Sequence, residues 1–154
     1  LDAALDAFAT SIGRRADGKD PAVAKGSGAA GGLGYALMCL GAVRVPGIAT
    51  VMEATGLEDR IRASDLVITG EGRFDWQSLR GKVVSGVATL TMPTARPCVV
   101  IAGDVVVGRR EFSALGVSSA YSIAEVVGSV EAALADPVGT LTKTAARVAR
   151  TWSH

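Results

Sequence analysis

Several residue types are scarce in this sequence, and each scarcity excludes a class of function. The 154 residues include one histidine, the terminal His154, and two cysteines, Cys39 and Cys98. A lone terminal imidazole leaves no internal base for a Ser-His-Asp or Cys-His mechanism and no ligand set for zinc. Both cysteines have apolar neighbours. We interpret them as small core residues in a reducing compartment, and we expect a cytoplasmic protein.

Long apolar runs and an excess of one charge are also missing. The longest apolar candidates, such as residues 83–90, are interrupted by small polar residues and glycine. They fall short of the roughly 18 residues that a membrane span requires. The 16 basic and 15 acidic side chains leave a net charge of only +1. We therefore expect no membrane partner, and no nucleic-acid partner bound through bulk charge.

What remains is the composition of a folded α/β protein. Apolar residues make up 49% of the chain, 19 residues are glycine and only 5% are aromatic. This composition allows a sizeable core, in which small side chains let helices pack closely on a sheet. The length suits one domain, or one large piece of a two-domain protein.

Residues 1–64 are predicted to be helical, with glycine-rich breaks. Apolar residues recur at helical spacing from Leu1 to Ile12, which predicts an amphipathic helix. The glycine-rich segment 26–34 precedes an apolar stretch. Further helices are predicted over 35–42, 48–55 and 57–63.

Residues 65–154 alternate between strand and helix patterns. Continuous β-prone runs predict buried strands over 66–69, 98–102 and 120–123. Helices are predicted between and after them, over 77–91, 109–115, 129–135 and 137–152. This alternation predicts an α/β fold, a parallel sheet with flanking helices that forms a Rossmann- or flavodoxin-like segment.

The strongest candidate site follows the first predicted strand, in an expected loop over 70–75 with its continuation to Lys82. Ligands collect at the carboxyl ends of strands in open parallel sheets. Glu71 and Asp75 offer hard oxygen donors for Mg²⁺. Arg73 and Lys82 offer charges that suit a phosphate. These are the components of phosphoryl transfer, although an ordinary glycine turn with a surface ion pair would contain the same residues.

Gly70 and Gly72 let the backbone turn tightly in this predicted loop, yet two standard nucleotide motifs fail there. A P-loop needs a glycine where Trp76 stands, and the dinucleotide fingerprint needs one at Asp75. A second candidate is segment 26–34, whose amides could cradle a phosphate or only allow a tight helix crossing. A third candidate is Asp104, after the second strand, which could reach the same crevice, although we favour a role as a turn or capping residue.

Three segments resemble, in order, those of the bacterial glycerate kinases of the first type. They read GSGAAGGLG over residues 26–34, DLVITGEGRFD over 65–75 and QSLRGK over 77–82. The similarity is good over residues 20–125 and loose elsewhere. Several long motifs in one order are far more specific than either glycine-rich segment alone.

The resemblance implies ATP- and Mg²⁺-dependent phosphorylation of D-glycerate to phosphoglycerate, in a cleft between two α/β domains. It implies that Glu71, Arg73, Asp75 and Lys82 face that cleft, opposite the glycine-rich segment. Asp75 would bind the metal or act as the base, and Glu71 is the other candidate metal ligand. Arg73 and Lys82 would steady charge on the transferred phosphoryl group. The expected substrate- or phosphate-binding glycines are Gly28, Gly31, Gly32, Gly70 and Gly72.

Members of this family are much longer than this chain. We therefore expect the C-terminal part of a glycerate kinase, inactive alone. Residues 1–64 would belong to the second α/β domain, and residues 65–154 would be the return segment of the first. Segments 90–96 and 103–105 depart from the family pattern.

Two other functions fit the sequence. The first is a truncated, non-catalytic domain that binds an anion or a nucleotide, or that serves in an interaction. The second is a nucleotide-binding sensor domain. Because an isolated C-terminal part would expose an apolar sheet edge or face, we also expect self-association into a homo-oligomer.

Overall fold

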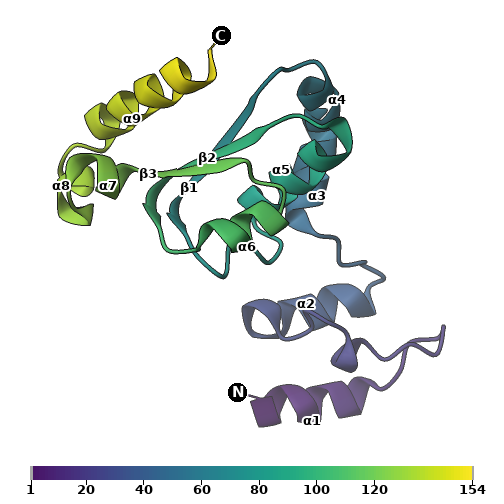
Figure 1. Ribbon diagram of the computed structural model, residues 1–154. Helices are drawn as coiled ribbons and strands as arrows, with labels where there is room; N and C mark the ends of the chain where they lie inside the picture. The colour runs from purple at the N-terminus through teal and green to yellow at the C-terminus, as the bar shows by residue number, and fades with distance from the viewer. Residues whose placement is uncertain (1, 154) are drawn as a thin grey trace. The chain divides into compact units, whose positions relative to one another are not determined.

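The computed structural model describes residues 2–153, which form two compact units that divide between Pro46 and Gly47. Leu1 and His154, which featured in the sequence predictions, lie outside the described residues. Figure 1 labels the helices and strands of both units.

The N-terminal unit pairs two helices, α1 (Asp2–Ile12) and α2 (Ala29–Cys39), with a short 3₁₀ helix (Pro21–Val23) between them. Both helices were predicted, although α2 begins and ends earlier than expected. Phe8 of α1 meets Tyr35 of α2 edge to face, with the ring centroids 6.0 Å apart. The Tyr35 ring is buried, and its hydroxyl donates to the Ala9 carbonyl at 3.5 Å. These contacts hold α2 against α1.

Helix α2 begins irregularly, because three successive residues have left-handed backbones. The φ angles of Ala30, Gly31 and Gly32 are 51°, 67° and 100°. Glycine adopts such angles without strain. A side chain at Gly32 would also crowd Leu5, since an added Cβ would lie 2.6 Å from its Cδ2 atom. The glycine-rich segment thus allows a turn and a close helix contact at once.

The C-terminal unit is built on a parallel sheet, which within the described residues has three strands in the order β1-β2-β3. Val67 lies opposite Cys98, and Val99 lies opposite Ser119. This sheet and its flanking helices confirm the predicted α/β fold. The strands are β1 (Val67–Phe74), β2 (Cys98–Val105) and β3 (Ser119–Ser122).

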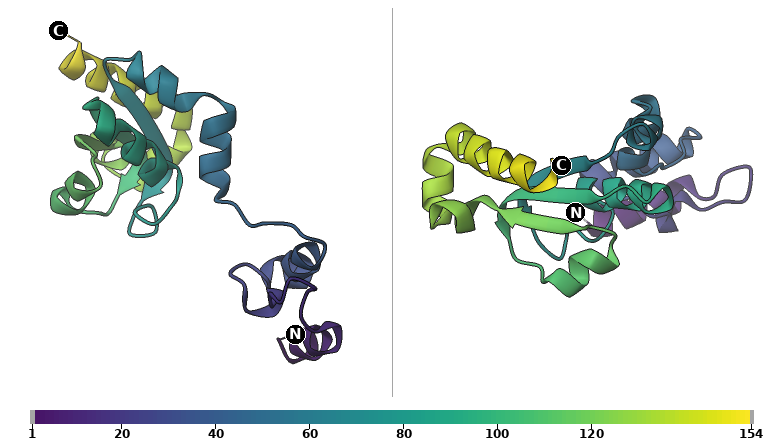
Figure 2. Two further views of the ribbon diagram at one scale, coloured as in Figure 1. Left: turned by 90° about the vertical axis from the view of Figure 1, so that its right-hand side faces the viewer. Right: turned by 45° about the horizontal axis from the view of Figure 1, so that its top comes forward.

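Helices cover both faces of the sheet (Figures 1 and 2). One face packs against α5 (Val83–Thr91) and α6 (Arg109–Ala114), through residues such as Val84 and Phe112. The other face packs against α7, α8 and α9, through Val99, Ile101 and Val148. Alternate residues of β2 therefore enter two separate apolar clusters, as period-two geometry requires. The three helices are α7 (Ile123–Val127), α8 (Val130–Ala135) and α9 (Pro137–Trp152).

Helices α3 (Gly47–Ala54) and α4 (Leu57–Arg62) belong to the same compact unit as the sheet. Met52 of α3 is buried in the cluster that contains α5. Gly86 of α5 allows this approach, since an added Cβ would lie 2.8 Å from the Met52 Cε atom. The boundary that we predicted between residues 64 and 65 concerns the domains of a longer protein, and it stays a prediction.

Three further boundary predictions, all in the C-terminal unit, were wrong by several residues. Residues 70–74 were expected to form a loop, but β1 continues to Phe74, which pairs with Val105 of β2. The second strand was expected to end at residue 102, but β2 continues through Gly103 to Val105. A helix was expected from residue 77, but α5 begins only at Val83, because Gly81 has a φ of 75°. Strand pairing and one left-handed residue override the local pattern here. Helix α7 was not predicted.

No helix within residues 2–153 is long and apolar enough to cross a membrane. Neither cysteine forms a disulfide. Cys98 is fully buried in the core of the sheet, as expected, and its burial raises the pKa of its thiol. Cys39 is only partly buried, so the prediction of a core residue holds less well there.

We expect a thiol reagent such as Ellman's reagent to modify Cys39 and to spare Cys98 in the folded chain. Burial blocks access to Cys98 and disfavours its thiolate, which is the reactive form. The absorbance of the released thiolate should report one fast cysteine, and a second only after denaturant is added. A Cys39→Ser variant that still reacts at once would show that Cys98 is accessible.

Candidate functional site

The candidate site begins where β1 ends and continues through a turn to the start of α5. Arg73 is on β1, Asp75 follows the strand, and Lys82 precedes the first residue of α5. This is the carboxyl edge of a parallel sheet, where open α/β folds bind their ligands. The structure thus brings three of the predicted residues to one edge.

Two polar residues, Ser78 and Gln77, organise the turn. The Asp75 Oδ1 atom accepts from the Gln77 backbone N–H at 2.8 Å, while the Asp75 N–H donates to the Ser78 Oγ atom at 3.2 Å. Ser78 is fully buried and donates to the Arg73 carbonyl at 3.3 Å. Lys82 donates from its Nζ atom to the Gln77 Oε1 atom at 3.3 Å. Asp75 and Lys82 are therefore both tied to Gln77.

Arg73 forms an ion pair with Asp104 on the neighbouring strand. Their Nε and Oδ2 atoms are 3.6 Å apart, and the two residues are register partners of β1 and β2. The Arg73 side chain is 64% exposed and that of Asp104 is 33% exposed. Such an exposed pair stabilises a fold by only about 0–1 kcal/mol. The guanidinium therefore remains available to an anionic ligand.

Glu71 of β1 lies opposite Ala102 of β2 and is partly buried. Its Oε1 atom is buried and has no hydrogen-bond partner within residues 2–153. A buried carboxylate oxygen without a partner is costly and rare. Among the predicted site residues, this atom is the one whose surroundings most clearly call for a ligand.

Gly70 and Gly72 lie within β1, not in an open loop, and their surroundings differ. A Cβ at Gly70 would overlap the carbonyl oxygen of Ile101, whereas one at Gly72 would meet no atom within 4 Å. Gly70 is thus required for the close approach of β1 to β2. Both glycines were predicted to serve a ligand, and that role stays a prediction.

Gly28, Gly31 and Gly32, the other predicted binding residues, belong to the N-terminal unit. Gly28 and Gly32 line a cavity of about 370 Å³ with Ser27, Tyr35 and residues of α1. A Cβ at Gly28 or Gly31 would meet nothing within 4 Å. Space beside these two glycines is compatible with a ligand.

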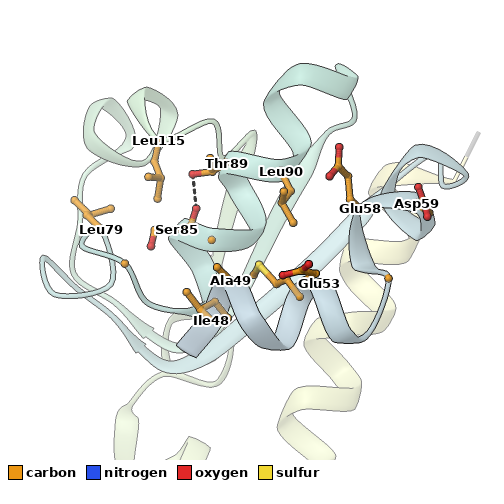
Figure 3. A pocket seen from close by; sticks show the side chains of 14 residues that line it. Ile48, Ala49, Glu53, Glu58, Asp59, Leu79, Ser85, Thr89, Leu90 and Leu115 are labelled. Atoms are coloured by element: carbon orange, nitrogen blue, oxygen red, sulfur yellow. Dashed lines mark hydrogen bonds between the residues drawn. The ribbon is translucent and has the colours of Figure 1, made fainter. Parts of the chain in front are cut away.

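A larger cavity of about 640 Å³ lies between α3, α4 and α5 (Figure 3). Its wall is mainly apolar, with Glu53, Glu58 and Asp59 as acidic members. Thr89 donates to the Ser85 carbonyl at 2.8 Å along its α5 side. Among the residues of the turn, Leu79 and Gly81 line this cavity, whereas Arg73, Asp75 and Lys82 do not. We therefore place the candidate site at the strand edge.

Three or more potential metal ligands do not cluster anywhere within residues 2–153. Mg²⁺ does not require such a cluster, because it commonly binds one or two carboxylates and completes its shell with water and phosphate oxygens. Either the Glu71 carboxylate, with its partnerless Oε1 atom, or the Asp75 carboxylate could supply such a ligand.

Sequence reasoning missed two residues of this site and misjudged a third. Ser78 and Gln77 carry no catalytic signature. Their role comes from hydrogen bonds within the turn, together with the Gln77 Oε1 atom that accepts from Lys82. Asp104 was interpreted as a turn or capping residue, but it lies on β2 beside Arg73. The signal was present, because Arg73 and Asp104 each follow their strand's first residue by six positions, and parallel pairing brings those positions together.

The fold and the candidate site define a parallel α/β protein with charged residues at the carboxyl edge of its sheet. The chain belongs to the glycerate kinase family, whose sequence model matches residues 1–153. This confirms the resemblance found in the sequence.

Three relatives illustrate the relation. An uncharacterized Mycobacterium bovis protein is 40% identical over 97% of this chain and 39% of its own length. A glycerate kinase of Haemophilus influenzae is 37% identical over 97% of this chain and 40% of its own length. A crystal structure from Salmonella typhimurium LT2, assigned as glycerate kinase 2, has a TM-score of 0.61 and 32% identity, and the match covers 97% of this chain and 40% of that one. The chain thus spans about two fifths of these relatives.

We expect Gly70→Ala to destabilise the fold by about 1–3 kcal/mol, because the new methyl group forces β1 away from the Ile101 carbonyl. Gly72→Ala is the matched control on the same strand, and its open surroundings predict a change below about 0.5 kcal/mol. Urea denaturation of both variants measures the difference. Equal stability of the two variants would contradict the close strand approach.

Proposed function

We propose that the full natural polypeptide carrying this chain transfers a phosphoryl group from ATP to D-glycerate and so forms phosphoglycerate. Membership of the glycerate kinase family supports this reaction. The observation that carries it in the structure is the group of charged residues at the carboxyl edge of β1 and β2. An anionic acceptor and an anionic donor both need cations, and phosphoryl transfer is catalysed mainly by positioning and charge.

Arg73 and Lys82 would supply these cations. Arg73 presents a planar fork that suits a carboxylate or phosphate, and Lys82 adds a point charge. Arg73 is ion-paired with Asp104, and Lys82 donates a hydrogen bond to Gln77, so each charge has a preferred direction before a ligand arrives. Orientation in advance is what makes electrostatic stabilisation effective.

Asp75 would act as the base that accepts the proton of the glycerate hydroxyl, or as a metal ligand. Its Oδ1 atom accepts from Gln77, which leaves the other oxygen for a substrate or a metal. Glu71, with its partnerless Oε1 atom, is the second candidate for Mg²⁺. When bound, Mg²⁺ would neutralise the developing charge on the phosphate oxygens. Gly28, Gly31 and Gly32 would offer backbone amides to a phosphate.

The alternative is an anion- or nucleotide-binding domain without catalysis. It applies most directly to the 154-residue chain alone, which we expect to be inactive. Ile68, Leu134 and Val138 are large apolar side chains with more than half of their surface exposed, and they support the prediction of self-association.

Titration of ATP with and without D-glycerate separates the two functions, because a kinase predicts that each ligand affects the binding of the other. We expect the reaction to take place in the cytoplasm, where ATP is supplied.

We expect Asp75→Asn to lower kcat/KM for D-glycerate by about 10²–10⁴-fold, the range typical of a lost acid–base group. The asparagine keeps an oxygen that can accept from the Gln77 N–H, so the turn and the melting temperature should be preserved. A coupled assay of ADP release in the full natural polypeptide measures the loss.

Asp65→Asn is the matched control. Asp65 is fully exposed and pairs only loosely with Arg96, at 3.7 Å. The turnover of the Asp65→Asn polypeptide should therefore stay within about twofold of that of the parent. Undiminished turnover in the Asp75 variant would rule out its assigned role. No turnover in the parent polypeptide would rule out the proposed reaction.

A further inference from the structure

The N-terminal unit contains a basic cavity to which the proposed reaction assigns no role. It has a volume of about 630 Å³ and lies between the connection after α1 and the end of α2. This volume falls within the range of ligand sites, about 300–1,000 Å³. Five of its lining residues are cations and one is a carboxylate: Arg14, Arg15, Lys19, Lys25, Arg44 and Asp20.

The few carboxylates nearby do not neutralise these cations. Asp20 caps the 3₁₀ helix by accepting from the Ala22 N–H at 3.0 Å. Asp17 is shared by Arg15 and Lys19, at 3.4 and 3.8 Å. Arg14, Lys25 and Arg44 therefore have no carboxylate partner within residues 2–153. Of these three, Lys25 and Arg44 also form no side-chain hydrogen bond there.

Hydrogen bonds to backbone carbonyls hold two of the arginines of the cavity. Arg15 donates to the Met38 carbonyl at 2.8 Å, near the end of α2, and Arg14 donates to the Gly18 carbonyl at 3.2 Å. Arg44 lies along the glycine-rich segment, with its Cδ atom only 3.1 Å from the position of a Cβ at Gly26. A side chain at Gly26 would displace Arg44, and the φ of 97° there also requires glycine. The cations thus converge from three separate stretches of chain.

We propose that this basic cavity binds a small molecule carrying a phosphate or diphosphate group. Several cations around one cavity, with few anions among them, attract a multiply charged anion. Arginine forks and lysine ammonium groups both suit phosphate oxygens. The inference rests on the cavity alone and not on the proposed reaction. All of the cavity's lining residues belong to the N-terminal unit, whereas Arg73 and Lys82 belong to the C-terminal unit.

The test is calorimetric titration of inorganic pyrophosphate into the full natural polypeptide at low ionic strength. To remove the cations of the candidate active site, the polypeptide carries Arg73→Gln and Lys82→Gln. Binding should persist in this background and should weaken as salt is added, since exposed charges are screened. Absence of binding in this background would overturn the proposal.

The decisive variant adds Lys25→Gln and Arg44→Gln. Loss of two charge-assisted contacts should weaken pyrophosphate binding by about tenfold or more. The control adds Lys143→Gln and Arg150→Gln, an exposed lysine and arginine of α9, and should bind within about twofold of the background. An equal loss in both would show that net charge alone attracts the anion, and would overturn the site.

The source of the phosphate group is settled by competition. ATP and 3-phosphoglycerate are each titrated against bound pyrophosphate in the same background. Displacement by ATP would identify a nucleotide phosphate as the ligand class, and displacement by 3-phosphoglycerate would identify a phosphorylated acid. Displacement by neither, at concentrations at which pyrophosphate saturates, would overturn the assignment to a phosphorylated small molecule.

Discussion

The close parallel pairing of β1 with β2 is the constraint on which the candidate site depends. Gly70 and Gly103 have no side chains, and their backbones approach carbonyl oxygens of the opposite strand that a methyl group would crowd. The pairing therefore continues as far as Phe74 and Val105. Without this extension the chain would leave the sheet earlier, and Arg73 would have no neighbour on β2.

Stability and site chemistry are largely separated within this unit. The apolar clusters on the two faces of the sheet contain fully buried residues such as Val84, Val99 and Val148, and burial of this kind dominates the folding free energy. Arg73, Asp75 and Lys82 at the strand edge form few and mostly exposed contacts. They can therefore be changed with little effect on the fold, which suits them to binding and catalysis.

The sequence predicted the fold class well because β-prone runs and helical periods alternate clearly after residue 65. It predicted strand ends poorly, because residues 70–74 are rich in glycine and charge, and only pairing with β2 makes them a strand. Glu71, Arg73, Asp75 and Lys82 were chosen for their chemistry. Asp104 was misjudged because its importance comes from the register of a neighbouring strand. Ser78 acts through backbone hydrogen bonds, which no residue pattern announces.

The hydrogen bond between Asp75 and the Gln77 N–H has a consequence for the entropy of binding. A side chain that a ligand must immobilise loses rotamer freedom, at a cost of about 0.5–1.5 kcal/mol. Asp75 has already lost this freedom on folding, since its Oδ1 atom is fixed by its own turn. A ligand that meets this carboxylate therefore finds it in place, and the folding of the turn, not the binding event, bears the entropic loss.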